Sequence, residues 1–169
     1  MTTKKLTLSH LTGAGDAHMV DVGDKAHTQR RAIARARVKM REETFLALAS
    51  GDTPKGDVLA AARIAGIQAA KRTSELIPLC HMVQLTRVEL SIELDGGVAL
   101  VTATAQAEDR TGVEMEAMVA VSVAALTLYD MLKGIDRSIV FDVWLAEKSG
   151  GKTGTWQRHS VPPPPPPGV

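Results

Sequence analysis

The chain has few aromatic residues and a single cysteine. Only five of its 169 residues are Phe, Tyr or Trp, so Ala, Val, Leu and Met must fill any hydrophobic core. Because Cys80 is alone, no disulfide can form within the chain, and a reducing, cytoplasmic environment is the simplest interpretation. The start, MTTKKLTLSH, is charged but is not followed by an apolar run, so no signal peptide is expected.

Long apolar runs and a net charge are also missing. The most apolar stretch, residues 117–129, is shorter than the roughly 20 residues of a membrane-spanning helix, so no membrane partner is expected. The formal net charge is only +1, yet residues 1–41 hold nine Lys or Arg against three Asp. Such a basic segment either binds phosphates or nucleic acid, or simply stays solvated. The length fits a single domain.

That apolar stretch predicts a central helix from about residue 113 to 133. Glu114 and Glu116 place negative charge in its first turn, where the helix dipole favours it, and Gly134 stands where a C-terminal cap belongs. Residues 117–129 are small and apolar on every side, which is typical of a helix enclosed by other elements. We therefore expect the rest of the fold to pack on it.

Charged residues stand at both ends of this helix. Asp130 and Lys133 share a face in the last turn. At about 1.5 Å per residue, Glu114 and Asp130 are roughly 24 Å apart along the axis. Either the two ends serve different purposes, or one site is assembled between subunits from the start of one helix and the end of another.

The remaining patterns complete an alternation of strands and helices. Alternating apolar residues predict three long strands and a last one, with a turn at Asp95, Gly96 and Gly97. The order strand, helix, strand, strand, helix, strand predicts an α+β, ferredoxin-like split βαβ sandwich: an antiparallel sheet with two long helices on one face. The other face would then need a partner, so oligomerisation is expected. Strands are predicted at 31–40, 88–94, 98–107 and 139–145, and further helices at 42–49 and 57–72. The chain as a whole is predicted to have a flexible start (1–17), one catalytic domain (18–155) and a flexible Pro-rich tail (156–169).

Several residues suit chemistry, and each also has a plain structural interpretation. His81 is either a general acid or base or a hydrogen-bonded structural histidine, and one Cys with scattered His lacks the ligand spacing of a zinc site. Asp130 and Lys133 are either a salt bridge or a catalytic pair with a partly desolvated lysine. The segment EKSGGKTG fails the Walker A pattern, although Lys148 and Lys152 could still reach an anion.

Three segments together resemble one family. KGDVLAAARIAGIQAAKRTSELIPLCH, RTGVEMEAMVAVSVAALTLYDMLK and EKSGGK, with the opening VDVGDKAHTQRRA, are similar nearly residue for residue to the molybdenum cofactor biosynthesis protein C family, the cyclic pyranopterin monophosphate synthases. The resemblance covers about residues 18–155. It implies a lyase that converts 3',8-cyclo-7,8-dihydro-GTP into cyclic pyranopterin monophosphate with release of pyrophosphate. It also implies a cytoplasmic homohexamer, a trimer of dimers, with the site at a dimer interface.

The resemblance also implies roles for individual residues. Asp130 and Lys133 of YDMLK would be catalytic, no metal site or cofactor is required, and magnesium accompanying the triphosphate is left open. The residues implied to bind substrate are Leu79, Cys80, His81, Glu114, Met115, Lys55, Lys148, Asp21 and Arg30. The cations among them would hold the triphosphate and the leaving pyrophosphate.

The chain departs from the family pattern at two positions near these residues, and the proline tail has no counterpart. Met82 replaces a usual Pro and is expected to loosen the loop that carries His81, and Leu132 replaces a usual Cys. Two rival functions remain at this stage. The first is a nucleic-acid binder, which would need aromatic side chains on the sheet to stack on bases, and the predicted strands lack them. The second is a noncatalytic ligand sensor, which is another common use of this fold.

Overall fold

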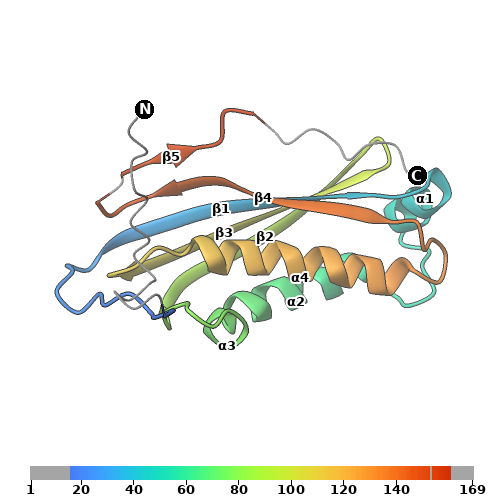
Figure 1. Cartoon of the computed structure of the whole chain (residues 1–169). Helices are drawn as coiled ribbons and strands as arrows, with labels where there is room; N and C mark the ends of the chain where they lie inside the picture. Colours follow the sequence, from blue (N-terminus) through green and yellow to red (C-terminus); the bar gives the residue numbers. More distant parts are fainter. Residues whose placement is uncertain (1–15, 153, 161–169) are drawn as a thin grey trace, which may run out of the picture.

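The computed structural model describes residues 16–152 and 154–160 as one layer of sheet covered by helices (Figure 1). The sheet is antiparallel throughout, in the strand order β2-β3-β1-β4-β5. The first four strands in this order, with a helix after β1 and another after β3, form the predicted ferredoxin-like split βαβ arrangement. The elements are β1 (Thr28–Lys39), α1 (Glu42–Ser50), α2 (Val58–Ala70), α3 (Thr73–Leu76), β2 (Leu85–Asp95), β3 (Val98–Asp109), α4 (Glu114–Leu132), β4 (Val140–Ser149) and β5 (Trp156–Gln157).

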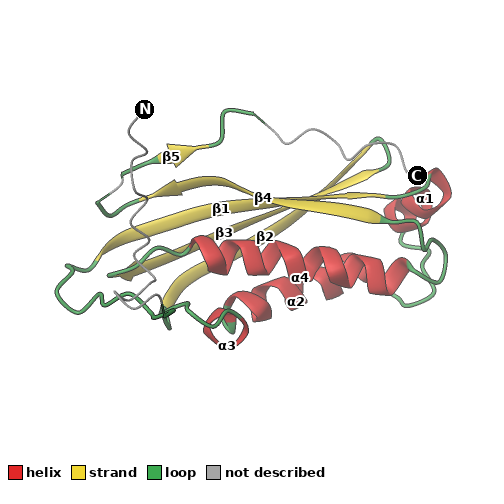
Figure 2. Cartoon of the chain, viewed as in Figure 1, coloured by secondary structure: helices red, strands yellow, loops and turns green. Residues whose placement is uncertain are grey.

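The two long helices, α2 and α4, lie side by side on one face of the sheet, and α1 lies at one end (Figure 2). The sheet face beneath them is made almost wholly of small residues, because alternate positions on the two central strands are alanine or valine. These side chains have no exposed surface: Ala32, Ala34, Ala36 and Val38 on β1, and Ala99, Val101, Ala103, Ala105 and Ala107 on β3. A sheet face of such small side chains lets α4 approach closely, and nine of its 19 residues are buried.

Among the described residues, α4 alone is long and apolar enough to cross a membrane, with 19 residues and a mean hydropathy of 1.5. The sequence argument that this helix is too short to span a membrane was therefore too strict. Many apolar residues of α4 lie in the core of the fold instead. The fully buried ones are Ala117, Ala120, Val121, Ala124, Ala125 and Leu128.

The helix ends differ in part from the sequence predictions. Asp57 caps α2 as predicted, because its Oδ1 accepts a hydrogen bond from the Ala60 N–H at 2.9 Å. The predicted glycine cap of α4 is wrong: Gly134 is not in the left-handed region, and Lys133 ends the helix in a right-handed conformation. The short helix α3 was not predicted. At the other end of the chain, β4 runs on to Ser149, so part of the predicted glycine-rich loop is strand.

The opposite face of the sheet is polar rather than apolar. Arg31 pairs with Glu147 and Arg37 with Asp142, and the Arg37 guanidinium lies 5.7 Å from the centre of the Trp144 ring. The partner that the sequence argument expected on this face, and with it oligomerisation, stays a prediction. Of the segments predicted to be flexible, residues 1–15 and 161–169 lie outside the described part, and Trp156 and Gln157 pair with β4.

Gly66 sets the distance between the two long helices. A Cβ at this position would lie 2.7 Å from the Ala120 carbonyl oxygen and would also meet the side chains of Leu90 and Ala124. We predict that Gly66→Ala destabilises the protein by about 1–3 kcal/mol, although alanine is the better helix former. Urea unfolding checks this. Gly134→Ala is the matched control, because no atom lies within 4 Å of its Cβ position, and equal stability changes in the two variants would contradict the prediction.

A buried carboxylate ties the end of α4 to the start of α1. Asp136 is 1% exposed; its carboxylate accepts hydrogen bonds from the Arg41 N–H at 2.9 Å and the Ser138 N–H at 2.8 Å, and pairs with the Arg41 guanidinium at 3.2 Å. Burial alone would raise the pKa of Asp136, but these contacts outweigh it and lower the pKa to about 2.

We predict that Asp136→Asn lowers the free energy of unfolding at pH 7 by about 3 kcal/mol, since one partner of a buried pair is lost. Because the folded pKa is depressed, the wild-type advantage is complete above about pH 4 and fades as the pH falls towards 2. Urea unfolding across this range measures it. Glu89→Gln, which breaks an exposed ion pair with Arg87, should change stability by less than about 1 kcal/mol. A pH-independent loss in Asp136→Asn would contradict the assignment.

Candidate functional site

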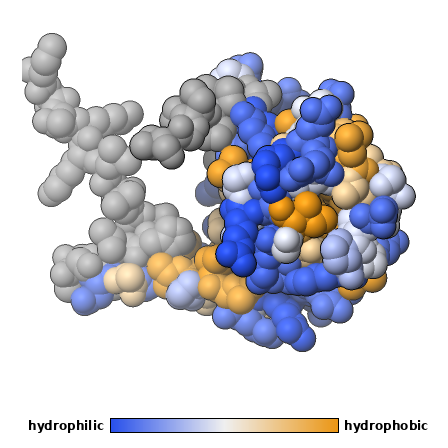
Figure 3. All heavy atoms as spheres, turned by 90° about the vertical axis from the view of Figure 1, so that its right-hand side faces the viewer, coloured by the Kyte–Doolittle hydropathy of each residue, from blue (hydrophilic) through white to orange (hydrophobic). Residues whose placement is uncertain are grey.

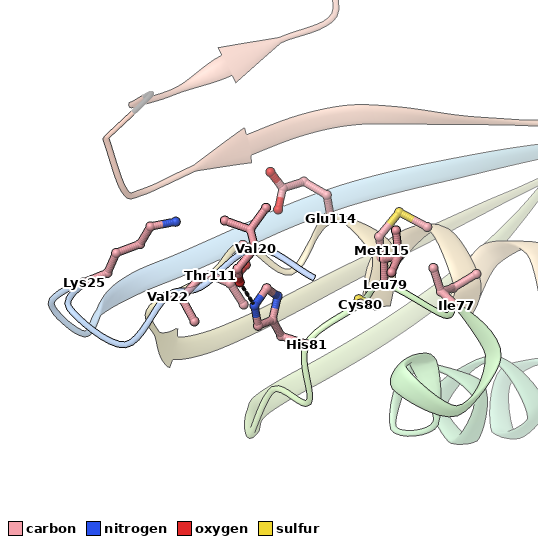
Figure 4. A pocket seen from close by; sticks show the side chains of 11 residues that line it. Val20, Val22, Lys25, Ile77, Leu79, Cys80, His81, Thr111, Glu114 and Met115 are labelled. Carbon is pink, nitrogen blue, oxygen red and sulfur yellow. Dashed lines mark hydrogen bonds between the residues drawn. The ribbon is translucent and has the colours of Figure 1, made fainter. Parts of the chain in front are cut away.

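A cavity of about 700 Å³ opens at the N-terminal end of α4 (Figure 4). Three segments far apart in the sequence form its wall: the stretch before β1, the loop after α3, and the first turn of α4. Its lining comprises Val20, Val22, Lys25, Ile77, Leu79, Cys80, His81, Thr111, Gly112, Glu114 and Met115. Five residues predicted to bind substrate are therefore brought together here: Leu79, Cys80, His81, Glu114 and Met115.

His81 is held in one orientation. Its Nε2 lies 2.7 Å from the carbonyl oxygen of Val20, as the dashed line in Figure 4 marks. Since a carbonyl oxygen only accepts, Nε2 carries the proton and donates it. In the neutral ring Nδ1 is then left as the acceptor, which suits a base or a hydrogen-bond acceptor towards a substrate.

Glu114 faces the cavity from the first turn of α4. Its Oε1 is 3.2 Å from Lys148 Nζ on β4, and its carboxylate folds over Gly112, where any Cβ would collide with it. The pair is partly buried, with side-chain exposures of 30% for Glu114 and 26% for Lys148. Lys148, predicted to hold an anion from a flexible loop, is therefore held by a carboxylate at the edge of the site.

Behind this carboxylate lies a second one. Glu116 is 2% exposed, and the Cys80 thiol approaches its Oε1 at 3.8 Å. Burial raises the pKa of Glu116, against the smaller lowering effects of a backbone hydrogen bond and of the thiol. Burial, followed by the charge of Glu116, also raises the pKa of Cys80 to about 11. At neutral pH Cys80 is thus a thiol rather than a nucleophilic thiolate.

A second cavity, of about 740 Å³, adjoins the first and shares Lys25, Thr111 and Gly112 with it. Four cationic residues line it: Lys25, Arg30, Arg110 and Lys152. Arg30 is anchored by donating to the carbonyl oxygens of Asp109 and Arg110, both at 3.2 Å. Asp21, also predicted, lies in the lining and accepts a hydrogen bond from the Gly23 N–H. The cations outnumber the two aspartates of the lining, Asp21 and Asp24, so the cavity favours an anion.

A separate charged cluster stands at the other end of α4, where Figure 3 shows a largely hydrophilic surface. Asp130 lies 2.7 Å from Lys133 Nζ and 3.1 Å from Lys55 Nζ, and Lys55 also donates to the Asp130 carbonyl oxygen. All three side chains are about half exposed. Hydrogen bonding to Lys133, and then to Lys55, lowers the pKa of Asp130, while the hydrogen bond to Asp130 raises the pKa of Lys133. In the single chain the pair is therefore the salt bridge, the first of the two interpretations, and Lys133 is a charged ammonium rather than a desolvated lysine of lowered pKa.

A model of the MoaC family matches residues 19–151. The chain belongs to the MoaC family. Relatives named cyclic pyranopterin monophosphate synthase are similar to it over nearly their whole length: 54% identity to that of Chloroflexus aggregans and 53% to that of Thermomicrobium roseum, each over 89% of this chain and 93% of the relative. Among solved structures, a de novo designed protein with a ferredoxin fold superposes with a TM-score of 0.41 at 8% identity, covering 78% of this chain and 97% of the other. That likeness is too low to add to the argument.

The MoaC-family chain does not unite the residues that the sequence assigned to one site. Eight of the nine residues predicted to bind substrate lie near the start of α4, and they include Lys148, Asp21 and Arg30. The ninth, Lys55, lies at the end of the helix with the predicted catalytic pair, Asp130 and Lys133. Sixteen residues of helix separate Glu114 from Asp130, roughly 24 Å. Figure 1 shows these two ends of α4 at opposite sides of the molecule.

Three residues of this MoaC-family site were not among those predicted. Glu116 had been interpreted as an ordinary first-turn charge, because helical spacing alone did not show which carboxylate points inward. Lys25 and Arg110 line the cavities from irregular segments, where no periodicity places a side chain. Within residues 16–152 and 154–160, no group of three or more His, Cys, Asp or Glu is arranged to hold a metal ion.

Proposed function

We propose that this protein is a cyclic pyranopterin monophosphate synthase. It converts 3',8-cyclo-7,8-dihydro-GTP into cyclic pyranopterin monophosphate, releases pyrophosphate, and acts in the cytoplasm in molybdenum cofactor biosynthesis. The observation that carries the proposal is the identity of 53–54%, over 89% of the chain, to relatives of that name. Magnesium is proposed only as a companion of the triphosphate, with no protein site of its own.

The two adjoining cavities suit the two parts of such a substrate. The first, lined by His81, Glu114 and several apolar side chains, offers hydrogen-bonding groups and an apolar wall to a fused ring. The second offers four cationic side chains to a triphosphate. Forming the cyclic phosphate requires a sugar hydroxyl to attack the innermost phosphorus in line, so holding both parts of the substrate is most of the work. The same cations stabilise the leaving pyrophosphate.

In the proposed site the catalytic pair comes from a second chain. Met115 and Leu126 are 39% and 56% exposed, and their spacing of 11 residues places them on one face of α4. Asp130 and Lys133 continue that face, being four and seven residues beyond Leu126. An antiparallel α4 from a second copy, packed on this apolar stripe, would bring its Asp130 and Lys133 to the cavity of the first. Two such sites form per dimer, and three dimers make the proposed hexamer.

In the shared site the charged groups have distinct tasks. Lys133, a charged ammonium, donates a proton or stabilises developing negative charge, and Asp130 keeps it in place. His81 accepts a proton at Nδ1. Proton transfers of this kind open and rebuild the purine-derived ring.

Loss of the catalytic pair should abolish turnover without unfolding the protein. We predict that Lys133→Ala and Asp130→Asn each lower kcat by about 10²-fold or more, with little change in Tm, because both side chains are half exposed. Pyranopterin formation from purified cyclised dihydro-GTP and a thermal melt measure the two effects. Lys71→Ala, which removes an exposed lysine elsewhere, should behave as wild type. A wild-type protein without turnover would favour a ligand sensor, and a large fall in Tm would make Asp130 structural.

Two inactive variants should complement each other if the site is shared. In a mixed dimer of Glu114→Gln and Lys133→Ala chains, one site carries both changes and the other carries neither. Random mixing by co-expression should therefore restore about a quarter of wild-type activity. Asp130→Asn with Lys133→Ala is the matched control: both changes lie at the same end of α4, so every site is defective and no activity returns. Equal activity of the two mixtures would refute the two-chain site.

A further inference from the structure

Three arginines of β1 point to the sheet face away from α2 and α4, because they alternate with the buried alanines of that strand. The first and the last of them pair with carboxylates of β4 at 2.5 Å: Arg31 with Glu147, and Arg37 with Asp142. Arg35 lies between them, and its neighbours in register are Thr102 on β3 and Trp144 on β4. Neither neighbour carries a charge, so the middle arginine differs from the other two.

Arg35 lacks a partner among the residues that the structure describes. Its Nε atom is buried without a hydrogen-bond acceptor, and no carboxylate within residues 16–152 and 154–160 forms an ion pair with its guanidinium. A guanidinium has five N–H donors, accepts nothing and keeps its charge, so it cannot lower this cost by losing a proton. A buried donor left unpaired is costly, and such a group calls for an acceptor from outside.

A cavity of about 190 Å³ lies over Arg35. Strands β1 and β4 form its floor, and β5 with the residues after it forms one side, away from α2 and α4 (Figure 1). Its lining includes Arg35, Trp144, Glu147, Arg158 and Ser160. The cavity is smaller than the roughly 300 Å³ at which pockets for organic ligands begin, so its size suits a small ion.

A β-bulge in β4 gives the cavity its place. The register of β4 on β1 shifts next to Ile33, which leaves Ala146 without a partner on β1. Because of this extra residue, Glu147 points to the open face, while the next residue, Lys148, points to the helix side and to the cavity at the start of α4. The small cavity and the two larger ones therefore share no lining residue.

Arg158 supplies a second cation in a fixed position. Its Nε donates to the Leu145 carbonyl oxygen at 2.9 Å, and its guanidinium lies 5.6 Å from the centre of the Trp156 ring. The carboxylate in the lining, Glu147, is already paired with Arg31. The cavity thus has an excess of positive charge, and the planar fork of a guanidinium matches the paired oxygens of an oxyanion.

We propose that Arg35 and Arg158 bind a small phosphate-type oxyanion in this cavity, with the Ser160 hydroxyl at its rim. The anion gives the Arg35 Nε the acceptor that it lacks, and it links β1 to the chain after β5. A whole nucleotide is too large for a cavity of this volume. The inference goes beyond the proposed function and does not rest on it.

Both tryptophans of the chain stand at this site, so intrinsic fluorescence reports on it. Trp144 lines the cavity and Trp156 packs against Arg158. Titration of the full chain with inorganic phosphate, at an ionic strength held constant with sodium chloride, should change the fluorescence saturably with a Kd of about 1 mM or lower. Arg35→Gln and Arg158→Gln should each weaken binding by about tenfold or more. Pyrophosphate, titrated separately, carries the same group, and the lower Kd of the two shows which anion the site prefers.

Arg87→Gln is the matched control. Arg87 is an exposed arginine on the same sheet face, paired with Glu89 and outside the cavity lining, so this variant should titrate as wild type. A fluorescence change that is linear in phosphate, or that is equal in wild type and Arg35→Gln, would be a general effect of salt and would overturn the site.

Thermal melting provides a second measurement that does not depend on fluorescence. About 10 mM phosphate should raise the Tm of the wild type by about 3 °C or more, and the Tm of Arg35→Gln by less, because only the wild type keeps the full site. An equal rise in both proteins would contradict the proposal, since phosphate would then act through the cationic cavity near α4 alone.

Sizing of the same variants tests another occupant, a carboxylate from a second copy of the chain. If Arg35→Gln forms a smaller assembly than wild type and neither anion binds the wild type, Arg35 pairs with a neighbouring chain and the anion site is wrong. A chain that fails to turn over the cyclised dihydro-GTP would refute the proposed function only, because the anion titrations need no substrate.

Discussion

The close packing of α4 onto a sheet face of alanine and valine constrains everything else in the molecule. Because the side chains below it are so small, the helix packs closely on the sheet and on α2 along one side, and Gly66 allows α2 to approach its backbone. A helix held in this way neither bends nor slides to bring its ends together. The charged residues at its two ends are consequently fixed roughly 24 Å apart.

The same packing gives the two ends different electrostatics. At the start of α4 the loop after α3 and the stretch before β1 lie beside the first turn, where Glu116 is buried and Glu114 pairs with Lys148. At its end Asp130 and Lys133 are about half exposed in the described part of the chain and form an ion pair in which both groups are charged. In the proposed two-chain site, the cavity of a neighbour would shield this pair from water and so strengthen the action of the Lys133 charge on the substrate. This argument supports the proposal independently of distance.

Regular patterns made much of this structure predictable. Period-two alternation located the four long strands and hence the split βαβ order, and the small apolar run located α4. The resemblance to a known family predicted which residues belong to the site, but not how those residues are arranged. Helical spacing placed Glu114 and Glu116 in one turn without showing that only Glu116 is buried, and it could not show that Lys133 is exposed. Lys25 and Arg110 come from segments without periodicity, where only the folded chain decides which side chain meets the cavity.

The two departures from the family pattern can now be weighed by position. Leu132 is fully buried at the end of α4, facing the core, so the usual cysteine there would also be a core residue and its loss removes nothing from either charged cluster. Met82 is 85% exposed and directly follows His81, where a proline would have stiffened the loop. The stiffness is supplied by other contacts: the Cys80 N–H to Ile77, the His81 ring to Val20, and the Cys80 thiol to Glu116. These contacts fix Cys80 and His81 directly and do not involve residue 82, so they oppose the loosening expected from Met82, which itself stays a prediction.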